Sequence, residues 1–247
     1  MMGRTVAIIQ ARMGSQRLPG KVLREIEGQS MLERVVRRVQ RSRLVDETVV
    51  ATSVSRADDE IVTACERLRV ASMRGSEDDV LDRYRAAALL HEAEVCVRVC
   101  ADSPFVDPGV CDLAVTALRD ADGGADYASN KIDPTYPLGL DVEVFTFAAL
   151  ERTWNEARDP YQRSHVTVHM RESPAAYRQV AVRDAVDRHS WRWTVDTADD
   201  LEFARQVFQR LHGSNNFGYM DVVRLIEWEP DLARINAHVR GKGVTDG

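Results

Sequence analysis

The sequence lacks an excess of positive charge. Among its 247 residues, 33 are Lys or Arg and 39 are Asp or Glu, which gives a formal net charge of -6. Proteins that bind nucleic acid through its phosphates usually have a basic excess or a clear basic stripe. The composition therefore argues against a general nucleic-acid surface, whereas a small anionic ligand would need only a local positive patch.

Long hydrophobic runs are also missing. No run of about 18 apolar residues occurs, and the N-terminus has no charged region followed by an apolar stretch of signal-peptide length. Hydrophobic residues make up 44% and charged residues 29% of the chain, as in ordinary soluble globular proteins. We expect a protein without a membrane segment that stays in the cytoplasm, with one main domain large enough to bury a core.

Cysteines are few, and their spacing does not repeat the CxxC pairs that are typical of a zinc site. The four are Cys65, Cys96, Cys100 and Cys111. Cys96 and Cys100 could share a metal ion with a distant histidine, but the spacing favours reduced thiols that lie buried in the core.

Apolar runs and helical patterns alternate along the chain. The first run, residues 5–10, breaks into a loop that contains Gly14, Pro19 and Gly20, a pattern typical of a buried parallel strand that ends at the carboxyl edge of a sheet. Ligands bind at that edge in α/β proteins. The further predicted strands are 47–51, 69–73, 94–100, 126–129, 141–147, 177–183 and 191–195. The predicted helices are 31–41, 58–68, 79–92, 108–119, 147–156, 161–171 and 198–211, and residues 219–238 are expected to be helical with a break at Pro230.

This order predicts an α/β fold in which helices cover both faces of a mainly parallel sheet. From residue 131 the alternation loosens, and we interpret residues 131–190 as a small inserted lobe of a single domain that spans 1–247. The alternation in 141–147 predicts a strand with one solvent-exposed face. Residues 241–247 are expected to fray.

The loop after the first predicted strand concentrates positive charge. Arg12, Arg17, Lys21 and Arg24 lie there with no acidic residue among them. The glycines of the loop allow the backbone to approach an anion, and Ser15 adds a hydrogen-bond donor. The pattern indicates a loop that holds a polyphosphate, and the alternative is a surface turn whose cations are solvated.

The spacing of this loop disfavours the two common phosphate-binding motifs. A Walker loop has four residues between its first glycine and the Gly-Lys pair, followed by Ser or Thr. Here five residues separate Gly14 from Gly20, and Val22 follows Lys21. No GxGxxG follows the first predicted strand either, so the loop is of another type.

The run IIQARMGSQRLPGKVL, residues 8–23, resembles the N-terminal signature of the cytidylyltransferases that activate acidic sugars. This family includes the 3-deoxy-manno-octulosonate and acylneuraminate enzymes, and the resemblance is greatest to its spore-coat polysaccharide branch. Further segments match the family in order: ATS (51–53), RGSEDDVLDRY (74–84), RVCADSPFVDP (98–108), DYASN (126–130), GLDVEVF (139–145), HVT (165–167) and WTVDTADDL (193–201).

The resemblance implies a Rossmann-like fold of the nucleotide-diphospho-sugar transferase type, with residues 131–190 serving acceptor binding and dimerisation. It implies transfer of a cytidylyl group from CTP to an acidic sugar or similar small acid, with release of pyrophosphate, by a homodimer. Transfer at phosphorus requires little covalent chemistry from a protein, so the site should align the acceptor and neutralise charge on the leaving group.

The resemblance places Arg12 and Lys21 on the triphosphate, and their charge suits a pyrophosphate leaving group. It places Asp102 and Asp196 on a divalent cation, for which Mg²⁺ is expected because it binds through few carboxylates plus phosphate oxygens and water. Each aspartate follows a predicted strand, so both could meet at the edge of the sheet that carries the Lys21 loop. The alternative for either aspartate is a helix N-cap.

The remaining nucleotide contacts expected from the resemblance are Ala11, Gly14, Ser15, Thr52, Ser53, Arg74, Gly75 and Ser76. The choice of cytosine rests on the resemblance alone. The expected acceptor-binding residues are Asn130, Tyr136, Gly139, Asp141, Glu143, Arg163 and His165. Arg163 or His165 could pair with a carboxylate or phosphonate of the acceptor, and the alternative for His165 is a helix-surface histidine.

The acceptor region departs from the family pattern. Ser164 stands where Glu is expected, Val168 and His169 stand where a Pro-aromatic pair is expected, and Leu138 replaces a more usual polar residue. Two other functions were weighed. A glycosyltransferase of related fold would carry a DxD motif, which ADSP at 101–104 is not. A non-catalytic nucleotide-binding partner in polysaccharide biosynthesis would be expected to have lost Lys21 or the aspartate pair.

Overall fold

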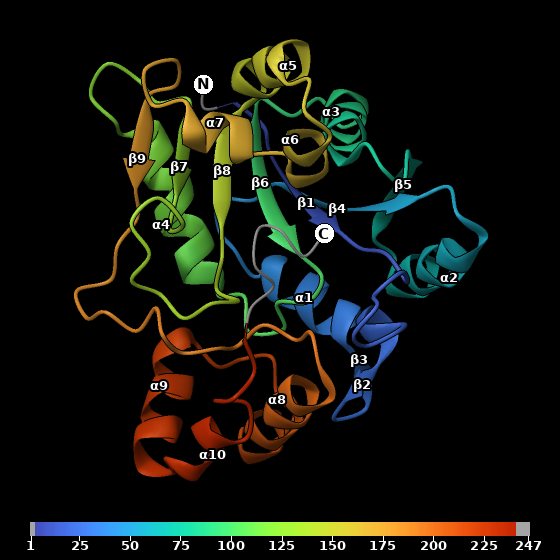
Figure 1. The fold of residues 1–247 in the computed structure, drawn as a ribbon, viewed down its shortest axis with the longest axis vertical. Coiled ribbons are helices and arrows are strands. Elements are labelled where there is room, and N and C mark those ends of the chain that lie inside the picture. The colour runs from blue at the N-terminus through green and yellow to red at the C-terminus, as the bar shows by residue number, and fades with distance from the viewer. Residues whose placement is uncertain (1–2, 241–247) are drawn as a thin grey trace.

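A seven-stranded sheet forms the centre of the computed structural model, which describes residues 3–240 (Figure 1). Its strand order is β5-β4-β1-β6-β8-β7-β9. The four strands β5, β4, β1 and β6 run parallel, β7 and β9 also pair in parallel, and β8 is antiparallel to both of its neighbours. The strands are β1 (Thr5–Gln10), β4 (Glu47–Ser53), β5 (Ala71–Gly75), β6 (Val95–Cys100), β7 (Tyr127–Ser129), β8 (Glu143–Thr146) and β9 (Gln179–Ala181). The expected α/β fold with a mainly parallel sheet is confirmed.

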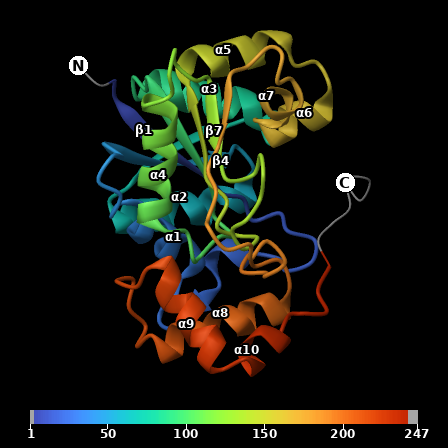
Figure 2. The same cartoon turned by 90° about the vertical axis from the view of Figure 1, so that its left-hand side faces the viewer.

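Helices cover both faces of this sheet because its strands are apolar on both sides. In β1, Ala7 and Ile9 belong to the core cluster with α1 and α4, whereas Val6 and Ile8 belong to the cluster with α3 and α5. The helices are α1 (Met31–Val39), α2 (Asp59–Leu68), α3 (Val80–Leu90), α4 (Pro108–Arg119), α5 (Phe147–Glu156), α6 (Pro160–His165), α7 (Val168–Glu172), α8 (Ala198–Arg210), α9 (Tyr219–Trp228) and α10 (Asp231–Arg234). Both views place α8–α10 at one end of the molecule and α5–α7 at the opposite end (Figures 1 and 2).

Three features differ from the sequence-based expectation. The predicted helix 161–171 is two helices, because Val166 takes a left-handed conformation (φ 59°) between α6 and α7. The predicted strand 191–195 is absent, and this segment makes only an isolated bridge between Arg192 and Leu138. β8 has no solvent-exposed face, since Glu143, Val144 and Phe145 are all buried between neighbouring strands and helices.

A short hairpin was not predicted. β2 (Glu25–Ile26) and β3 (Gln29–Ser30) pair antiparallel around Glu27 and Gly28, both of which have positive φ. Ser30 ends this hairpin and caps α1, because its hydroxyl accepts a hydrogen bond from the backbone N–H of Glu33 at 3.2 Å. The hairpin thus connects the charged loop to α1 without a long linker.

Residues 131–190 are integrated with the rest of the fold. Their strands β8 and β9 belong to the central sheet, and their helices α5 and α6 pack against α3. Their expected roles in acceptor binding and dimerisation stay predictions. The expected fraying of residues 241–247 falls outside the described residues.

Cys65, Cys96 and Cys111 are buried, Cys100 is half-buried, and all four are free thiols. Burial raises the pKa of the Cys96 thiol to about 12. Within residues 3–240, no three side chains from His, Cys, Asp and Glu are grouped as a metal site would require, so the Cys96–Cys100–histidine alternative is wrong there. Over the same residues, no helix combines the length and apolar character that crossing a bilayer demands.

Candidate active site

A cavity of about 420 Å³ lies at the carboxyl ends of β1 and β6, where the charged loop leaves the sheet. This is the edge at which parallel sheets bind ligands. The cavity is lined by Gln10, Ala11, Arg12, Gly14, Ser15, Gln16, Arg17, Lys21, Val22, Arg83, Cys100, Ala101, Asp102 and Asp196. The structure therefore brings the predicted triphosphate residues and both predicted metal ligands to one place.

The charged loop is anchored to the neighbouring strand through Asp58. One carboxylate oxygen of Asp58 accepts a hydrogen bond from the backbone N–H of Met13 at 2.7 Å. The other accepts from the hydroxyl of Thr52 at 3.1 Å and from the hydroxyl of Ser53 at 2.5 Å. Since Thr52 and Ser53 are both 0% exposed, their side chains fix the loop and do not face the cavity. A contact of Thr52 and Ser53 with the nucleobase was expected, and it stays a prediction for their backbone N–H and C=O groups.

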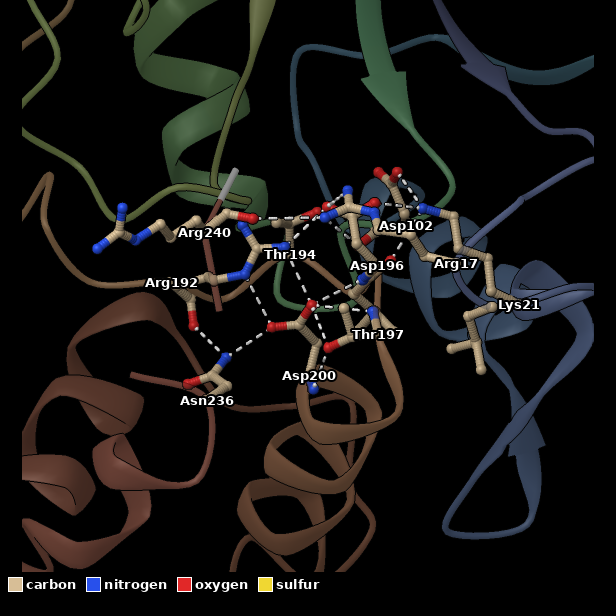
Figure 3. A network of polar contacts seen from close by, with 12 residues as sticks. Arg17, Lys21, Asp102, Arg192, Thr194, Asp196, Thr197, Asp200, Asn236 and Arg240 are labelled. Carbon is tan, nitrogen blue, oxygen red and sulfur yellow. Dashed lines mark hydrogen bonds and ion pairs between the residues drawn. The ribbon is translucent and has the colours of Figure 1, made fainter. Parts of the chain in front are cut away.

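Lys21 lies at the centre of the site, at the start of a short 3-10 helix that covers Lys21–Leu23. Its ammonium nitrogen is 2.8 Å from Asp102 Oδ2, 2.8 Å from Asp196 Oδ1 and 2.9 Å from the carbonyl oxygen of Val195 (Figure 3). Burial lowers the pKa of Lys21, but the charges of both aspartates outweigh burial and the net pKa is raised. Lys21 is therefore a held, charged group that bridges two carboxylates.

Neither aspartate caps a helix through its side chain. The cap of α4 is Asp107, whose carboxylate accepts from the backbone N–H of Val110, and the cap of α8 is Thr197 in a capping box with Asp200. The N-cap alternative is thus wrong for Asp102 and Asp196. Their carboxylates instead converge on one cation, which is the arrangement that a divalent metal site needs.

Asp196 is held in place by a network from the C-terminal part of the chain, which Figure 3 draws. Its Oδ2 accepts from Arg192 at 2.8 Å and pairs with Arg17 at 2.9 Å. Arg192 is fixed in turn by Asp200, which is 0% exposed and also accepts a hydrogen bond from Asn236 at 2.9 Å. This leaves Asp196 Oδ1 directed toward Lys21 and the cavity.

Arg192, Asp200 and Asn236 were missed by sequence reasoning. Asp200 lies in the family-like segment 193–201, but Arg192 and Asn236 lie outside every segment that matches the family, and the contacts among the three depend on the tertiary fold. Arg17, which belongs to the predicted loop, pairs with Asp196 and so faces the site. Burial alone would raise the pKa of Asp196. Lys21, Arg192 and Arg17 outweigh burial, so the net pKa is lowered and Asp196 is held ionised.

The other predicted nucleotide residues fall into two groups. Ala11, Arg12, Gly14 and Ser15 line the cavity, and Arg12 is exposed with no hydrogen bond or ion pair to any residue within 3–240. Arg74, Gly75 and Ser76 do not line the cavity. Arg74 donates to the carbonyl oxygens of Ser53 and Ser55 at 2.9 and 2.7 Å and pairs with Asp59 at 2.6 Å, so it ties together the loop after β4.

Glu143 is the centre of a buried polar cluster. It is 2% exposed, forms an ion pair with Arg98, and accepts hydrogen bonds from the hydroxyls of Tyr127 and Thr167, both at 2.6 Å. Burial alone would raise the pKa of Glu143, but Arg98 and Lys131, with the two hydroxyls, outweigh it and hold the pKa at about 2. Glu143 therefore stays ionised near neutral pH and anchors β8 to β6, β7 and the start of α7.

We expect Glu143→Gln to lower the free energy of unfolding by about 3–5 kcal/mol at pH 7, because it leaves the buried charge of Arg98 without its partner. The folded pKa of Glu143 is depressed from its ordinary 4.5 to about 2, so its contribution is present above pH 4.5 and is lost as the pH falls toward 2. Urea denaturation of both proteins should show a difference that shrinks over this interval. Glu156→Gln, which removes an exposed pair with Arg152, serves as control and should change stability far less. A constant difference from pH 7 to pH 2 would contradict this account.

The other predicted acceptor residues are engaged with several different partners in the protein. Asn130 is 3% exposed, and its side-chain amide donates to the carbonyl oxygen of Leu140 and accepts from the backbone N–H of Val142. Tyr136 is buried against the ring of Tyr219.

Gly139 has φ 103°, and a Cβ there would lie 2.3 Å from the backbone nitrogen of Thr194, so only glycine fits. Asp141 pairs with Lys131 at 3.3 Å, and Arg163 pairs with Asp79 at 2.6 Å.

His165 is exposed at the end of α6, and its ring lies against Tyr161. Partial burial of the ring is the main cause that lowers the pKa of His165, and the nearby charge of Arg98 adds to it. The neutral form of His165 is therefore favoured near pH 7. A neutral imidazole hydrogen-bonds a carboxylate but adds no charge. Lys131, which sequence reasoning did not select, is the cation that stands beside Asp141, and Asp141 and Glu143 raise the pKa of Lys131.

Comparison with known proteins agrees with this geometry. The sequence profile of the family described as cytidylyltransferase matches residues 6–219. An uncharacterised protein of Methanocaldococcus jannaschii is 34% identical over 98% of each chain. The spore coat polysaccharide biosynthesis protein SpsF of Bacillus subtilis is 33% identical over 92% of this chain and 95% of that protein.

Solved structures have the same fold. A cytidylyltransferase from Leptospira borgpetersenii serovar Hardjo-bovis superposes with a TM-score of 0.91 at 27% identity, over 98% of this chain and 100% of that one. A CMP:2-keto-3-deoxy-manno-octonic acid synthetase complexed with CTP superposes with a TM-score of 0.66 at 20% identity, over 84% of this chain and 99% of that one.

Proposed function

Because this chain belongs to the cytidylyltransferase family, and so is a CTP-dependent nucleotidyltransferase, we propose that it transfers the cytidylyl group of CTP to an acidic sugar or similar small acid. An anomeric hydroxyl oxygen of the acceptor forms a bond to the α-phosphorus, and the bond from that phosphorus to pyrophosphate breaks. The products are a CMP-linked acid and pyrophosphate. The observation that carries the proposal is the contact of Lys21 with both Asp102 and Asp196 at the wall of the cavity.

The donor set of Asp102 and Asp196 fits Mg²⁺. Two hard carboxylate oxygens already surround one cation, the Lys21 ammonium, at 2.8 Å each. Protein-bound Mg²⁺ typically uses one or two carboxylates and fills its remaining positions with water and substrate phosphates. Asp102 and Asp196 would hold the ion, which supplies positive charge at the reacting phosphate when bound.

Lys21 must then change partners during the cycle. In the structure its charge is balanced by the two carboxylates, and a triphosphate in the cavity offers a second set of anionic oxygens. We propose that Lys21 moves to the β- and γ-phosphates when CTP binds, while Arg192 and Asp200 keep Asp196 oriented. Arg12, which is exposed and unpaired within residues 3–240, adds a second cation for the leaving pyrophosphate.

The direct test is to incubate the protein with CTP, Mg²⁺ and a panel of acidic sugars and to measure pyrophosphate release. We expect release that requires CTP, Mg²⁺ and at least one acceptor that carries a carboxylate. UTP and GTP in place of CTP are the matched controls. CTP binding without pyrophosphate release from any acceptor would contradict the enzymatic proposal and favour a non-catalytic nucleotide-binding role.

The two alternative functions find no support in the site. A glycosyltransferase would use a nucleotide sugar and would not need a loop built for a triphosphate. A non-catalytic partner would not need to retain Lys21, Asp102 and Asp196, which are all present and in mutual contact. The proposed class of acceptor rests on the family and on the cationic side chains around Glu143. The panel of acidic sugars tests this element of the proposed function.

A further inference from the structure

Arg83 is a buried cation in the wall of the cavity to which sequence reasoning gave no role. It lies in the first half of α3, is 1% exposed and lines the cavity together with Gln10 and Ala11. Its position is fixed by the next residue, because the hydroxyl of Tyr84 donates a hydrogen bond to the carbonyl oxygen of Ile8 in β1 at 3.0 Å. Arg83 is therefore held at the cavity by the packing of α3 on the sheet.

The guanidinium of Arg83 has few partners. Its Nη1 donates to the carbonyl oxygen of Ser76 at 2.9 Å, its Nε has no acceptor, and no carboxylate pairs with it within residues 3–240. Burial, only partly offset by nearby groups, lowers the pKa of Arg83. Other buried arginines have more partners: Arg98, whose Nε also lacks an acceptor, pairs with Glu143, and Arg34 donates to backbone carbonyls of Ile26, Glu27 and Gly213. A buried guanidinium whose Nε has no acceptor and which has no carboxylate partner is costly, and this indicates room for a further acceptor.

The chain makes room for this side chain at Gly75. A Cβ on Gly75 would lie 3.1 Å from Cγ of Arg83, closer than nearly all real contacts of that kind. Gly75 has a negative φ, so its backbone conformation does not itself demand glycine. The glycine at this position is therefore explained by the close approach of Arg83.

Arg12 is close enough to Arg83 for its charge to contribute to the lowered pKa of Arg83. Arg83 itself lies in the wall of the cavity beside the turn between β5 and α3. It contacts none of Lys21, Asp102 and Asp196, and its one hydrogen bond goes to Ser76, in the turn between β5 and α3. Among the residues near that turn, Thr52 and Ser53 are engaged with Asp58, and Arg74 ties together its own loop. Arg83 is thus the side chain that reaches the cavity from the region expected to bind the base.

We propose that Arg83 binds the cytosine of CTP and selects it over uracil, an inference that rests on the proposed function. A guanidinium donates hydrogen bonds and accepts none. Cytosine offers two neighbouring acceptors, O2 and N3, whereas N3 of uracil carries a hydrogen and is itself a donor.

The test measures equilibrium binding of CTP, UTP and GTP to the full chain in the presence of Mg²⁺ and without acceptor. We expect Arg83→Gln to weaken CTP binding by at least about tenfold and to change UTP binding far less, because a bidentate base contact discriminates by about tenfold or more. Arg83→Lys retains the charge and the aliphatic stem but loses the planar fork, so it should not restore the preference for CTP. Arg85→Gln is the matched control, since Arg85 lies on the same helix but pairs with Glu151.

The outcomes separate this inference from the function itself. Equal losses of CTP and UTP affinity would assign Arg83 to the phosphates and overturn base selection, and so would rescue of CTP preference by lysine. Unchanged CTP binding in a folded Arg83→Gln protein would make Arg83 purely structural. If Arg83→Gln does not fold, the CTP to UTP affinity ratio of Arg83→Lys decides alone. A wild-type protein that binds no CTP would contradict the proposed function, whereas CTP binding that is indifferent to Arg83 contradicts only this inference.

Discussion

Replacing Lys21 with alanine is expected to lower the rate of pyrophosphate release by at least about 10², because the change removes a charge that acts on the leaving group. Lys21 is 11% exposed in its side chain and makes three polar contacts below 3 Å, so its ammonium is held at the cavity, from which it can move to the phosphates. Arg24→Ala is the matched control in the same loop, since Arg24 is exposed and makes only a 3.5 Å contact with a carbonyl oxygen. Full activity of Lys21→Ala would show that the loop does not act on the pyrophosphate.

The contacts of Lys21 also predict an effect on the metal. Its ammonium competes with a divalent cation for Asp102 and Asp196, so the nucleotide-free protein should bind Mg²⁺ or Mn²⁺ weakly. In Lys21→Met, whose side chain has similar length but no charge, Mn²⁺ should bind more tightly in the absence of nucleotide. Titration of Mn²⁺ by electron paramagnetic resonance measures this directly. Weaker or unchanged Mn²⁺ binding in the variant would mean that the ammonium does not occupy the metal position.

Local patterns were enough to predict the parallel half of the fold. β1, β4 and β6 are short, largely apolar runs, and the amphipathic helices between the strands can likewise be identified from neighbouring residues. The errors occur where distant parts of the chain decide the conformation. Trp191 and Trp193 alternate like a strand, but Trp193 is 1% exposed because it packs in the core on Phe105 and Tyr219. The break at Val166 likewise follows from tertiary packing, since no Gly or Pro marks it.

One missed element did carry a local signal. A glycine such as Gly28 in the second position of a two-residue connection, here Glu27 and Gly28 between residues 25–26 and 29–30, is typical of a hairpin turn. Gly28 has φ 74°. The hairpin could have been predicted from that glycine. Its two-residue strands are too short to show an alternating pattern.

The residues of the candidate site that lie in sequence motifs could be predicted from the sequence. The loop residues Arg12 and Lys21 and the aspartates 102 and 196 were expected together, and the structure brings them to one cavity. Arg83 was not selected from sequence, although it lies in the family-like segment 74–84, because that segment alone does not show which of its side chains reach the ligand. Only the orientation of α3 places Arg83 at the cavity and Arg85 against Glu151.

Asp102→Asn is expected to abolish the dependence on Mg²⁺ or the activity itself, with a loss of about 10² or more, because an amide replaces one of two charged ligands. Asp102 is a cleaner choice than Asp196, whose carboxylate also pairs with Arg17 and Arg192, so that its removal would leave two further cations without this partner. Among residues 3–240, the polar contacts of the Asp102 side chain are with Lys21 and, at 3.5 Å, with the hydroxyl of Ser103, so thermal stability should change little.

The measurement is pyrophosphate release as a function of Mg²⁺ concentration, with a thermal melt of each protein to confirm folding. Asp122→Asn, at an exposed position outside the cavity, is the control for loss of one negative charge from the surface. Because the two aspartates are proposed to bind one metal ion together, any activity that remains in the variant should not respond to Mg²⁺ as the wild-type activity does. A Mg²⁺ titration that matches the wild type would show that the cation binds elsewhere, and Asp102 would then serve to hold Lys21 in the position that the structure shows.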